Sequence, residues 1–185
     1  DDLEPDGEKW LEELNEVVFD NYSFTYPMAE KESLSQISLR FNRGQTIGIV
    51  SRTGAGKTSL VRQFLRQYPL GQGKFTINGQ PVARYVRRSI EEKIGYVSQE
   101  HILFSKSILE NISLGKKGAS QEEIMEAIAQ AAFADDLERM SDGLDTLIGE
   151  KGVSVSGGQK QRISLARAFL RDAQLLLLDD SLSAV

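Results

Sequence analysis

The sequence predicts an α/β fold, with strands near both ends of the chain and helices between them. Residues 37–41 alternate between apolar and polar side chains, as a half-buried strand does. Residues 175–178 are four consecutive leucines, which is typical of a short strand covered on both faces in a parallel sheet. The stretch between them carries helical spacing and helix-capping residues, and this arrangement favours strands and helices around one core.

Composition excludes several classes of protein. A chain of 185 residues can form one domain, or a domain with a subdomain, and bury a core. Its apolar fraction of 40% and charged fraction of 26% argue against disorder or a coiled coil. There is no cysteine and one histidine, which excludes a disulfide framework, a thiol nucleophile and a Cys- or His-rich metal site. A net charge of −5 argues against a nucleic-acid binder with a basic surface.

Residues 1–16 are predicted to be an acidic, solvated leader. Lys9 is the single base among eight acids, so this stretch has a net charge of −7 and leaves the rest of the chain near neutral. Trp10, Leu11 and Leu14 could instead form one stripe of a helix. The acidic start argues against a signal or transit peptide, and no apolar run is long enough to cross a bilayer.

The first half of the chain predicts strands separated by turns. Residues 17–24 form a strand interrupted by a turn or bulge at 20–21, and residues 37–41 form the half-buried strand. Residues 42–44 form a turn, and residues 46–50 a short apolar strand.

Helical spacing begins after a glycine-rich segment. We expect a helix over 58–67 with Leu60, Phe64 and Leu65 on one face. Residues 75–82 resemble a strand, an Asn78-Gly79 turn and a second strand.

The middle and the end of the chain carry two capped helices. Residues 120–123 match a capping box, and the following helix places its small and apolar side chains on one face. These side chains are Ile124, Ile128, Ala131 and Ala132. Ser156 is a good N-cap for a helix from Gly157 to about Leu170.

The glycine-rich segment 51–58 indicates a phosphate-binding loop. It matches three of the four fixed positions of the G-x-x-x-x-G-K-[ST] pattern, with Ser51 in place of the first glycine. Gly54 and Gly56 permit positive φ, so that backbone N–H groups at a helix start can face phosphate oxygens. Lys57 would reach the β- and γ-phosphates, and the Thr58 hydroxyl would bind Mg²⁺. The alternative is a glycine-rich turn with a surface lysine.

Two further segments suit a nucleotide site. Asp179 ends the leucine strand, where an acid would hold Mg²⁺; the alternative is a turn that terminates the strand. Ser156, Gly157 and Gly158 form a second helix start that is open to an anion, unless it is simply a capped helix. The chain thus has two phosphate-type helix starts and one lysine-bearing loop. The second helix start could contact a nucleotide that is bound by another protein molecule.

Together these motifs resemble the ATP-binding domain of ABC transporters, over about residues 17–185. Segment 51–58 is similar to the Walker A motif, 155–159 to the signature motif and 175–179 to Walker B. The resemblance assigns ATP contacts to Tyr26, Ser51, Arg52, Thr53, Gly54, Ala55, Gly56, Lys57, Thr58 and Ser59. It assigns Mg²⁺ to Thr58, Gln99 and Asp179, and the ATP of a partner to Ser156, Gly157, Gly158 and Gln159.

The resemblance also implies an architecture and partners. It implies a P-loop NTPase core of mostly parallel sheet, an antiparallel β subdomain, and a helical subdomain over about 100–160 that carries the signature motif. Residues 1–16 would link to a membrane-spanning domain that is absent here, and the part of the family beyond Val185 is missing. Residues 148–152 are similar to the X-loop of exporters, so Glu150 would contact coupling helices. The implied location is the cytoplasmic face of the cell membrane.

The implied activity is ATP hydrolysis that drives export, catalysed by Gln99 and Asp180 in a head-to-tail pair of domains. Asp180 stands where the family has glutamate, so its shorter side chain predicts a slow, degenerate site and a different, competent partner subunit. His101 is interpreted as a surface residue, not a substitute for the family's switch histidine. The alternatives are a nucleotide-gated regulatory module, or a soluble ABC ATPase of translation or DNA repair.

Overall fold

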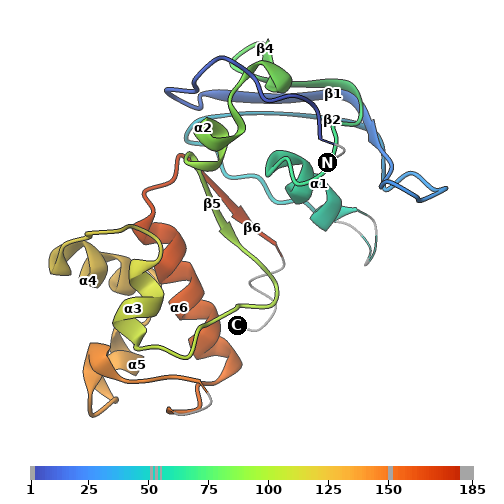
Figure 1. The fold of residues 1–185 in the computed structure, drawn as a ribbon. Helices are drawn as coiled ribbons and strands as arrows, with labels where there is room; N and C mark the ends of the chain where they lie inside the picture. Colours follow the sequence, from blue (N-terminus) through green and yellow to red (C-terminus); the bar gives the residue numbers. More distant parts are fainter. Residues whose placement is uncertain (1–2, 51, 53, 55, 150–151, 180–185) are drawn as a thin grey trace. The chain divides into compact units, whose positions relative to one another are not determined.

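The structure is a computed structural model that describes residues 3–179 except 51, 53, 55, 150 and 151. The chain divides into two compact units, Asp1–Ile94 and Gly95–Val185, and each is described by itself. Figure 1 shows strands and helices in both units. The predicted α/β fold class is confirmed.

Unit 1 is built on a four-stranded antiparallel sheet in the order β2-β1-β3-β4. The strands are β1 (Glu16–Phe24), β2 (Leu34–Asn42), β3 (Gln72–Ile77) and β4 (Gln80–Pro81). Both strands predicted before residue 42 are confirmed. The bulge predicted at 20–21 is present as well, because the pairing of β1 with β2 shifts register between Phe19 and Tyr22, and Asn21 has φ 48°.

The turn between β3 and β4 also matches its prediction. Asn78 and Gly79 have φ of 51° and 74°, as a hairpin turn with two left-handed residues requires. The Asn78 Oδ1 accepts hydrogen bonds from the backbone N–H groups of Asn15 and Glu16, at 2.9 and 3.0 Å. The turn therefore also fixes the start of β1.

Helix α1 (Lys57–Phe64) packs on this sheet through its apolar face. The Phe64 ring lies 5.0 Å from the Phe19 ring and 5.6 Å from the Phe75 ring, centroid to centroid, in edge-to-face contacts. Leu60 and Phe64 are buried as predicted. The helix ends three residues before the predicted end at Gln67, because the backbone turns into the left-handed region at Arg66, with φ 50°.

The strand predicted over 46–50 is wrong. These residues form no strand, and Ile47, Ile49 and Val50 are 42, 48 and 95% exposed. A strand needs a neighbour to accept and donate its backbone hydrogen bonds, and no strand in the described part of the chain pairs with this segment.

Residues 3–15, which we call the N-terminal strap, pack along unit 1 without forming a helix. Leu11 and Leu14 are only 1 and 3% exposed. The Lys9 N–H donates to the Arg84 carbonyl at 3.0 Å, and the Leu11 N–H donates to the Ser89 Oγ at 3.0 Å. The expectation of a fully solvated leader is therefore wrong for the apolar side chains, although Asp6, Glu8, Glu12 and Glu13 are exposed. A role of residues 1–16 as a link to a membrane domain stays a prediction.

The strap lies against two short elements. They are the 3₁₀ turn η1 (Val82–Arg84) and helix α2 (Arg87–Glu91), which follow β4 directly. The Asp6 carboxylate accepts a hydrogen bond from the Arg87 N–H at 2.8 Å, so the strap also caps the start of α2.

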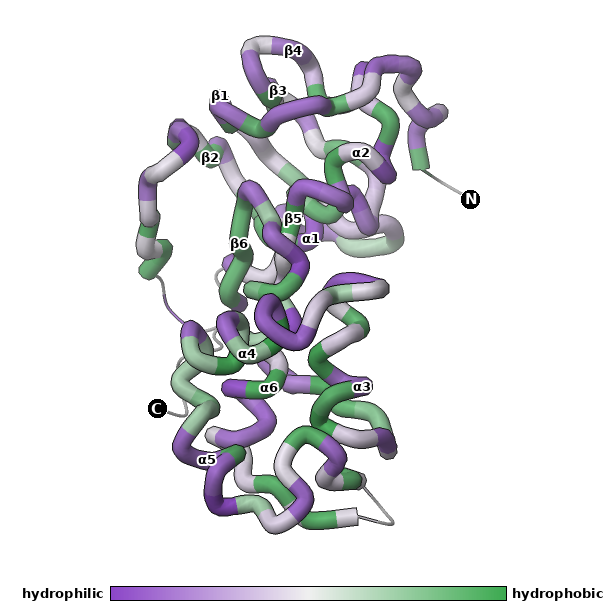
Figure 2. Tube along the Cα trace, turned by 90° about the vertical axis from the view of Figure 1, so that its left-hand side faces the viewer, coloured by the Kyte–Doolittle hydropathy of each residue, from purple (hydrophilic) through white to green (hydrophobic). Residues whose placement is uncertain are grey.

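Unit 2 contains a small sheet and a group of helices. Strand β5 begins at the unit boundary, and β5 (Ile94–Val97) and β6 (Leu175–Leu178) run in the same direction in Figure 1. Figure 2 shows β6 as hydrophobic. Its leucines are nevertheless only half-buried, with Leu178 39% exposed, because in the described part of the chain β5 alone pairs with it. The expectation of a strand covered on both faces is thus wrong here.

The helices of unit 2 are joined by one apolar cluster. They are α3 (Ile108–Ser113), α4 (Gln121–Gln130), α5 (Ala134–Glu138), the 3₁₀ turn η2 (Gly143–Asp145) and α6 (Gly157–Leu170). Six residues of this cluster are completely buried: Ile108, Ile112, Ile128, Phe133, Ile163 and Ala166. Three of these helices lie inside the range 100–160 predicted as a helical subdomain, whose boundaries stay a prediction. No helix in the described residues has the length and apolar character to span a bilayer.

The two helices of unit 2 that were predicted to be capped begin as predicted. Ser120 and Glu123 form the expected capping box of α4, and α6 runs from Gly157 to Leu170. Ala132 is the exception on the predicted apolar face. It is exposed and has φ 53°, because α4 has already ended at Gln130.

Candidate functional site

The phosphate-loop segment leads directly into α1. Gly56 is the N-cap of α1, with φ 95°, and a Cβ at this position would lie 2.3 Å from the Ser33 carbonyl oxygen. Gly54 has φ 78° and open space where a Cβ would be. Both glycines therefore adopt the left-handed conformation that was predicted, and close approach of the Ser33 carbonyl is a second reason for glycine at Gly56 alone. Ser51, Thr53 and Ala55 lie outside the described residues.

The start of α1 fits a bound phosphate. No acid lies in its first turn and no side chain caps it, so its N–H groups and partial positive charge suit an anionic ligand. Lys57 and Thr58 are its first two residues, half-buried and exposed respectively. Arg52 is exposed on the loop before it. These residues supply an ammonium group and a hydroxyl where the triphosphate and Mg²⁺ of a nucleotide would need them.

Tyr26 lies beside the same helix. Its hydroxyl donates a hydrogen bond to the Ser59 Oγ at 2.9 Å and accepts one from the Arg62 Nη1 at 3.3 Å. Its ring makes an edge-to-face contact with Tyr68 at 4.8 Å and lies 5.9 Å from the Arg62 guanidinium carbon. The structure thus brings Tyr26 together with Ser59, two of the predicted ATP contacts. Since the Ser59 side chain is buried and bonded to Tyr26, we expect a phosphate contact from Ser59 to use its backbone N–H.

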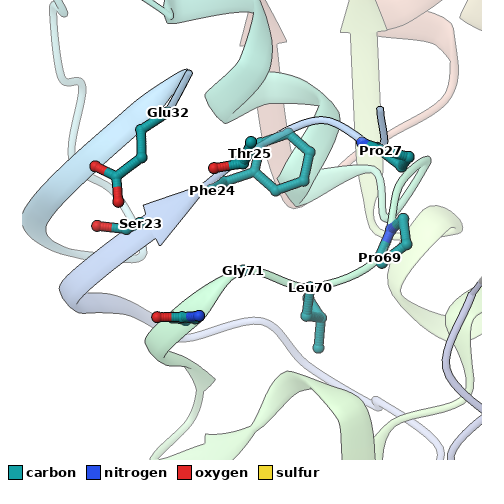
Figure 3. A pocket seen from close by; sticks show the side chains of 9 residues that line it. Ser23, Phe24, Thr25, Pro27, Glu32, Pro69, Leu70 and Gly71 are labelled. Atoms are coloured by element: carbon teal, nitrogen blue, oxygen red, sulfur yellow. The ribbon is translucent and has the colours of Figure 1, made fainter. Parts of the chain in front are cut away.

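A hollow of about 260 Å³ lies next to this region of unit 1 (Figure 3). It is lined by residues 23–25, 27, 32 and 69–72, from the end of β1 and the loops beyond β1 and α1. Glu32 is its only ionisable side chain. A carboxylate without a basic partner in the lining would repel a triphosphate, so this hollow does not suit the phosphates of a nucleotide.

In unit 2, Gln99 and Asp179 lie at one edge of the small sheet. Asp179 directly follows β6, and its N–H donates to the Val97 carbonyl at 3.0 Å. Its side chain is 7% exposed and accepts a hydrogen bond from the Tyr96 hydroxyl at 3.5 Å. Gln99 is exposed in the turn directly after β5. Carboxylate and amide oxygens are suitable Mg²⁺ ligands.

No cluster of three or more His, Cys, Asp or Glu side chains that could hold a metal occurs in the described residues. The candidate Mg²⁺ ligands are therefore a partial set, as in sites where phosphate oxygens and waters complete the coordination. Thr58 belongs to unit 1, and Gln99 and Asp179 belong to unit 2. Asp180 lies outside the described residues.

The second helix start has the predicted cap and an additional support. The Ser156 Oγ accepts from the Gln159 N–H at 3.2 Å, and the Gln159 Oε1 accepts from the Ser156 N–H at 2.9 Å. Gly157 has open space around its missing Cβ, so a ligand can approach its backbone. The Asp136 carboxylate of α5 accepts from the Gln159 Nε2 at 3.2 Å and from the Arg162 Nε at 2.9 Å. The sequence analysis missed Asp136 and Arg162, and no sequence signal joins residues that far apart.

The segment that follows Gln99 is held by α3 and α6. Arg167 donates to the carbonyls of Ile102 and Asn111, at 3.0 and 2.9 Å. The buried Asn111 side chain accepts from the Phe104 N–H at 2.9 Å and donates to the Phe104 carbonyl at 3.0 Å. Burial lowers the pKa of the Arg167 guanidinium from its ordinary value. The sequence analysis missed this role of Arg167, whose only sequence signal is an arginine within the mostly apolar stretch 163–170.

His101, in the same segment, is half-buried and has φ 43°. Its Nδ1 is buried without a hydrogen-bond partner in the described part of the chain, and burial lowers its pKa. Its interpretation as a surface residue is therefore wrong, because its ring is partly covered by the protein.

The segment similar to an X-loop adjoins residues 102–107. The Ile148 N–H donates to the Lys106 carbonyl at 3.1 Å, and the Val153 N–H donates to the Leu147 carbonyl at 2.8 Å. These adjoining segments carry four exposed apolar side chains, which we call the apolar rim: Ile102, Phe104, Leu147 and Val153, each 49–57% exposed. Glu150 lies outside the described residues.

Comparison with known proteins identifies similar chains. The family model described as "ABC transporter" matches residues 34–183. The "Probable multidrug resistance ABC transporter ATP-binding/permease protein YheI" of Bacillus subtilis is 49% identical over 175 residues, which are 95% of this chain and 30% of that protein. The "ATP-dependent lipid A-core flippase" of Sodalis glossinidius is 40% identical over 92% of this chain and 29% of its own length.

A solved structure is similar as well. The "Structure of a bacterial Atm1-family ABC exporter with ATP bound" superposes with a TM-score of 0.89 and 34% identity, over 99% of this chain and 32% of that chain. The present chain therefore spans about a third of the length of the proteins that it matches.

Proposed function

The chain belongs to the ABC transporter family, and on that premise we propose that it is the ATP-binding part of a membrane exporter. The observation that carries this proposal is the start of α1. Its uncapped first turn, its left-handed Gly56 and the adjacent Lys57 form a site for the phosphates of ATP. The names of the relatives support an export function for multidrug or lipid substrates.

Each residue of the site has a proposed role. The backbone of Gly54–Ser59 holds the phosphates, and the Lys57 ammonium stabilises charge on the β- and γ-phosphates. The Tyr26 ring stacks on adenine. Thr58, Gln99 and Asp179 hold Mg²⁺, which supplies electrostatic stabilisation of the transferred phosphoryl group. Gln99 and Asp180 are assigned to the water that attacks it, with Asp180 at the position where the family has glutamate.

A second ATP-binding domain and a membrane-spanning domain are the proposed partners of this chain. We assign the start of α6, residues 156–159, to the ATP of that partner, because Gly157 leaves the backbone open while Asp136 and the capping box fix the turn. The apolar rim and Glu150 are assigned to the coupling helices of a membrane-spanning domain, since exposed apolar side chains near charged ones are typical of protein interfaces. With these contacts we propose the cytoplasmic face of the cell membrane as the location of the domain.

The site of this chain is proposed to be slow. Aspartate at position 180 is one methylene shorter than glutamate. A general base must come within hydrogen-bond reach of the water, and the shorter side chain supports the proposal that this reach is lost. Loss of a general base lowers the rate by about 10²–10⁴-fold. The intact second helix start would serve a competent site on a different subunit.

Steady-state ATP hydrolysis by the full-length protein, beside its Asp180→Glu variant, tests this function. Both proteins are first shown to bind MgATP. We expect wild type to bind and turn over slowly, and Asp180→Glu to gain rate. Asp142→Glu, which lengthens an exposed acid at the N-cap of η2, is the matched control and should leave the rate unchanged. Fast turnover by wild type alone would contradict the slow site and favour a self-sufficient homodimer.

A nucleotide-gated regulatory module is the second candidate, and the same Asp180 favours it. The assay separates the two, because a regulatory module binds MgATP without gaining turnover in Asp180→Glu. Failure of wild type to bind MgATP would contradict both.

A further inference from the structure

The N-terminal strap is joined to the turn after α1 by an ion pair whose arginine is buried and whose glutamate is partly exposed. The Arg66 Nη2 donates to the Glu4 Oε2 at 3.2 Å, and the side chains are 1 and 26% exposed. The other Glu4 carboxylate oxygen accepts from the Leu70 N–H, and its backbone carbonyl accepts from Arg87. One strap residue therefore binds the turn after α1, the loop before β3 and the start of α2.

Helix α1 carries a row of buried polar contacts that leads to this pair. Near its start, Ser59 bonds to Tyr26, and near its end, the Gln63 Oε1 accepts from the Tyr22 hydroxyl. Arg66 follows two residues after the helix ends. Ser59, Gln63 and Arg66 are 7, 0 and 3% exposed, so one partner of each contact is shielded from water.

The surroundings of Arg66 oppose replacement of its ion pair with Glu4 by hydrogen bonds to water. Its guanidinium Nη1 donates to the carbonyls of Val82 and Tyr85, at 3.4 and 3.3 Å, and its backbone is held at φ 50°. Breaking a buried pair leaves a charge without compensation, so a displacement of α1 moves Glu4 with it. A two-turn helix is short enough to move as one body, so a change at Gly56 and Lys57 reaches Arg66.

We propose that Glu4 is a positioning residue for the nucleotide site, and that the strap responds to nucleotide at the start of α1 through Ser59, Gln63 and Arg66. This inference rests on the proposed function. It gives the strap a regulatory role, in which binding at the phosphate loop changes how tightly residues 3–15 are held on unit 1. The buried side chains of Leu11 and Leu14 hold the rest of the strap on unit 1. A change at Glu4 therefore loosens or tightens the whole strap, not Glu4 alone.

Hydrogen exchange of the full-length protein, with and without saturating MgATP, tests the proposal. The peptide over residues 3–15 is suitable because the N–H groups of Lys9, Leu11 and Asn15 are hydrogen-bonded to unit 1. We expect MgATP to change its exchange rate by about fivefold in wild type, the lower end of typical coupling between sites. Glu4→Gln should lose that dependence while it still binds MgATP. Glu4→Asp keeps the charge at a shorter reach and should retain part of it.

Glu8→Gln is the matched control, since it removes one exposed acid of the same strap and should behave as wild type. A merely structural Glu4 would raise exchange equally with and without MgATP. Unchanged exchange in wild type that binds MgATP would overturn the proposal and leave the proposed function intact. If wild type does not bind MgATP in a separate equilibrium measurement, the proposed function fails and the strap proposal fails with it.

Discussion

At the scale of single residues, the candidate site depends on side chains that each have two roles. The Tyr26 ring is proposed to stack on adenine, and its hydroxyl donates to Ser59. The Tyr22 hydroxyl donates to Gln63 and its oxygen accepts from the Gly71 N–H at 2.6 Å. Both tyrosines therefore link the sheet or its loops to α1. Single substitutions can separate the contribution of the ring from that of the hydroxyl.

Substitution of Tyr26 tests its proposed contact with adenine. Stacking of a base on an aromatic ring contributes about 1–3 kcal/mol, so Tyr26→Ala should raise the Kd for MgATP by about 5–150-fold. Tyr26→Phe keeps the ring and loses only the bond to Ser59, so its Kd should rise by less than about fivefold. Equilibrium nucleotide binding measures both. Equal effects of Ala and Phe would contradict stacking.

Alkaline pH should destabilise the protein through Tyr22. Burial raises the pKa of its hydroxyl to about 12, with a smaller opposing effect of the Gly71 N–H. The folded protein thus binds this proton more tightly than the unfolded chain, whose tyrosine has a pKa near 10. The stabilisation is complete below about pH 10 and is lost as pH rises through about 12.

The free energy of unfolding between about pH 8 and 12 measures this effect, which is on the order of 2 kcal/mol. Tyr22→Phe should be less stable at pH 8 and show a shallower alkaline decline. The same decline in wild type and Tyr22→Phe would rule out Tyr22 as its cause.

At the scale of elements, three helices begin with the same capping box, and they differ in what surrounds it. Ser107, Ser120 and Ser156 each accept from the backbone three residues on, and each third residue returns a bond. Only α6 has glycines at its first two helical positions and the Asp136 carboxylate behind its cap. The cap of α6 therefore suits ligand binding, whereas the cap of α4 suits stability alone.

Two serine substitutions separate these roles. Ser156→Ala and Ser120→Ala should each lower the free energy of unfolding by about 1 kcal/mol, as loss of an N-cap does. Ser156→Ala should also lower ATP turnover of the assembled pair of domains by about tenfold or more, because it removes a hydrogen bond to a charged phosphate. Thermal unfolding and steady-state hydrolysis measure the two effects. Equal turnover of the two variants would contradict the assignment of residues 156–159 to a partner's ATP.

At the scale of the whole molecule, the fold divides the proposed roles between its units. Unit 1 holds the phosphate loop, Tyr26 and the strap, while unit 2 holds Gln99, Asp179, the second helix start and the apolar rim. Unit 2 therefore combines the residues proposed to act on a partner's ATP with those proposed to contact a membrane domain.

The apolar rim should couple ATP hydrolysis to substrate transport without contributing to nucleotide binding. We expect Leu147→Ser in the full-length protein to reduce substrate transport and leave the Kd for MgATP unchanged, since Leu147 is exposed and is not among the residues assigned to ATP or Mg²⁺. Leu114→Ser, at a leucine of similar exposure (55% against 57%) after α3, is the control and should leave transport unchanged. Transport in vesicles and nucleotide binding are the measurements. Unaltered transport by Leu147→Ser would argue against the rim as a coupling surface.

The local features of this protein were predictable from the sequence. The bulge at Asp20-Asn21, the Asn78-Gly79 turn, the start of α6 at Gly157 and the positive φ of Gly56 all match, because each depends on the conformations open to a few neighbouring residues. The phosphate loop could be recognised for the same reason, since its chemistry lies within eight consecutive residues.

The failures concern pairing and burial. The segment 46–50 has the composition of a strand and forms none, and the leucines of β6 are only half-buried. In both cases, strand formation and burial depend on which other segments lie alongside. The composition of an apolar segment does not determine those neighbours.

The amino-acid sequence was sufficient to predict the α/β class, the helix caps, the turns and the residues that could bind phosphate and Mg²⁺, because these follow from local backbone preference and side-chain chemistry. The folded structure was needed to see that the acidic strap is anchored, that Glu4 meets Arg66, and that Asp136 supports the second helix start. Those contacts join residues between 23 and 83 positions apart. Their formation depends on the packing of whole elements, which brings distant side chains together and excludes water from them.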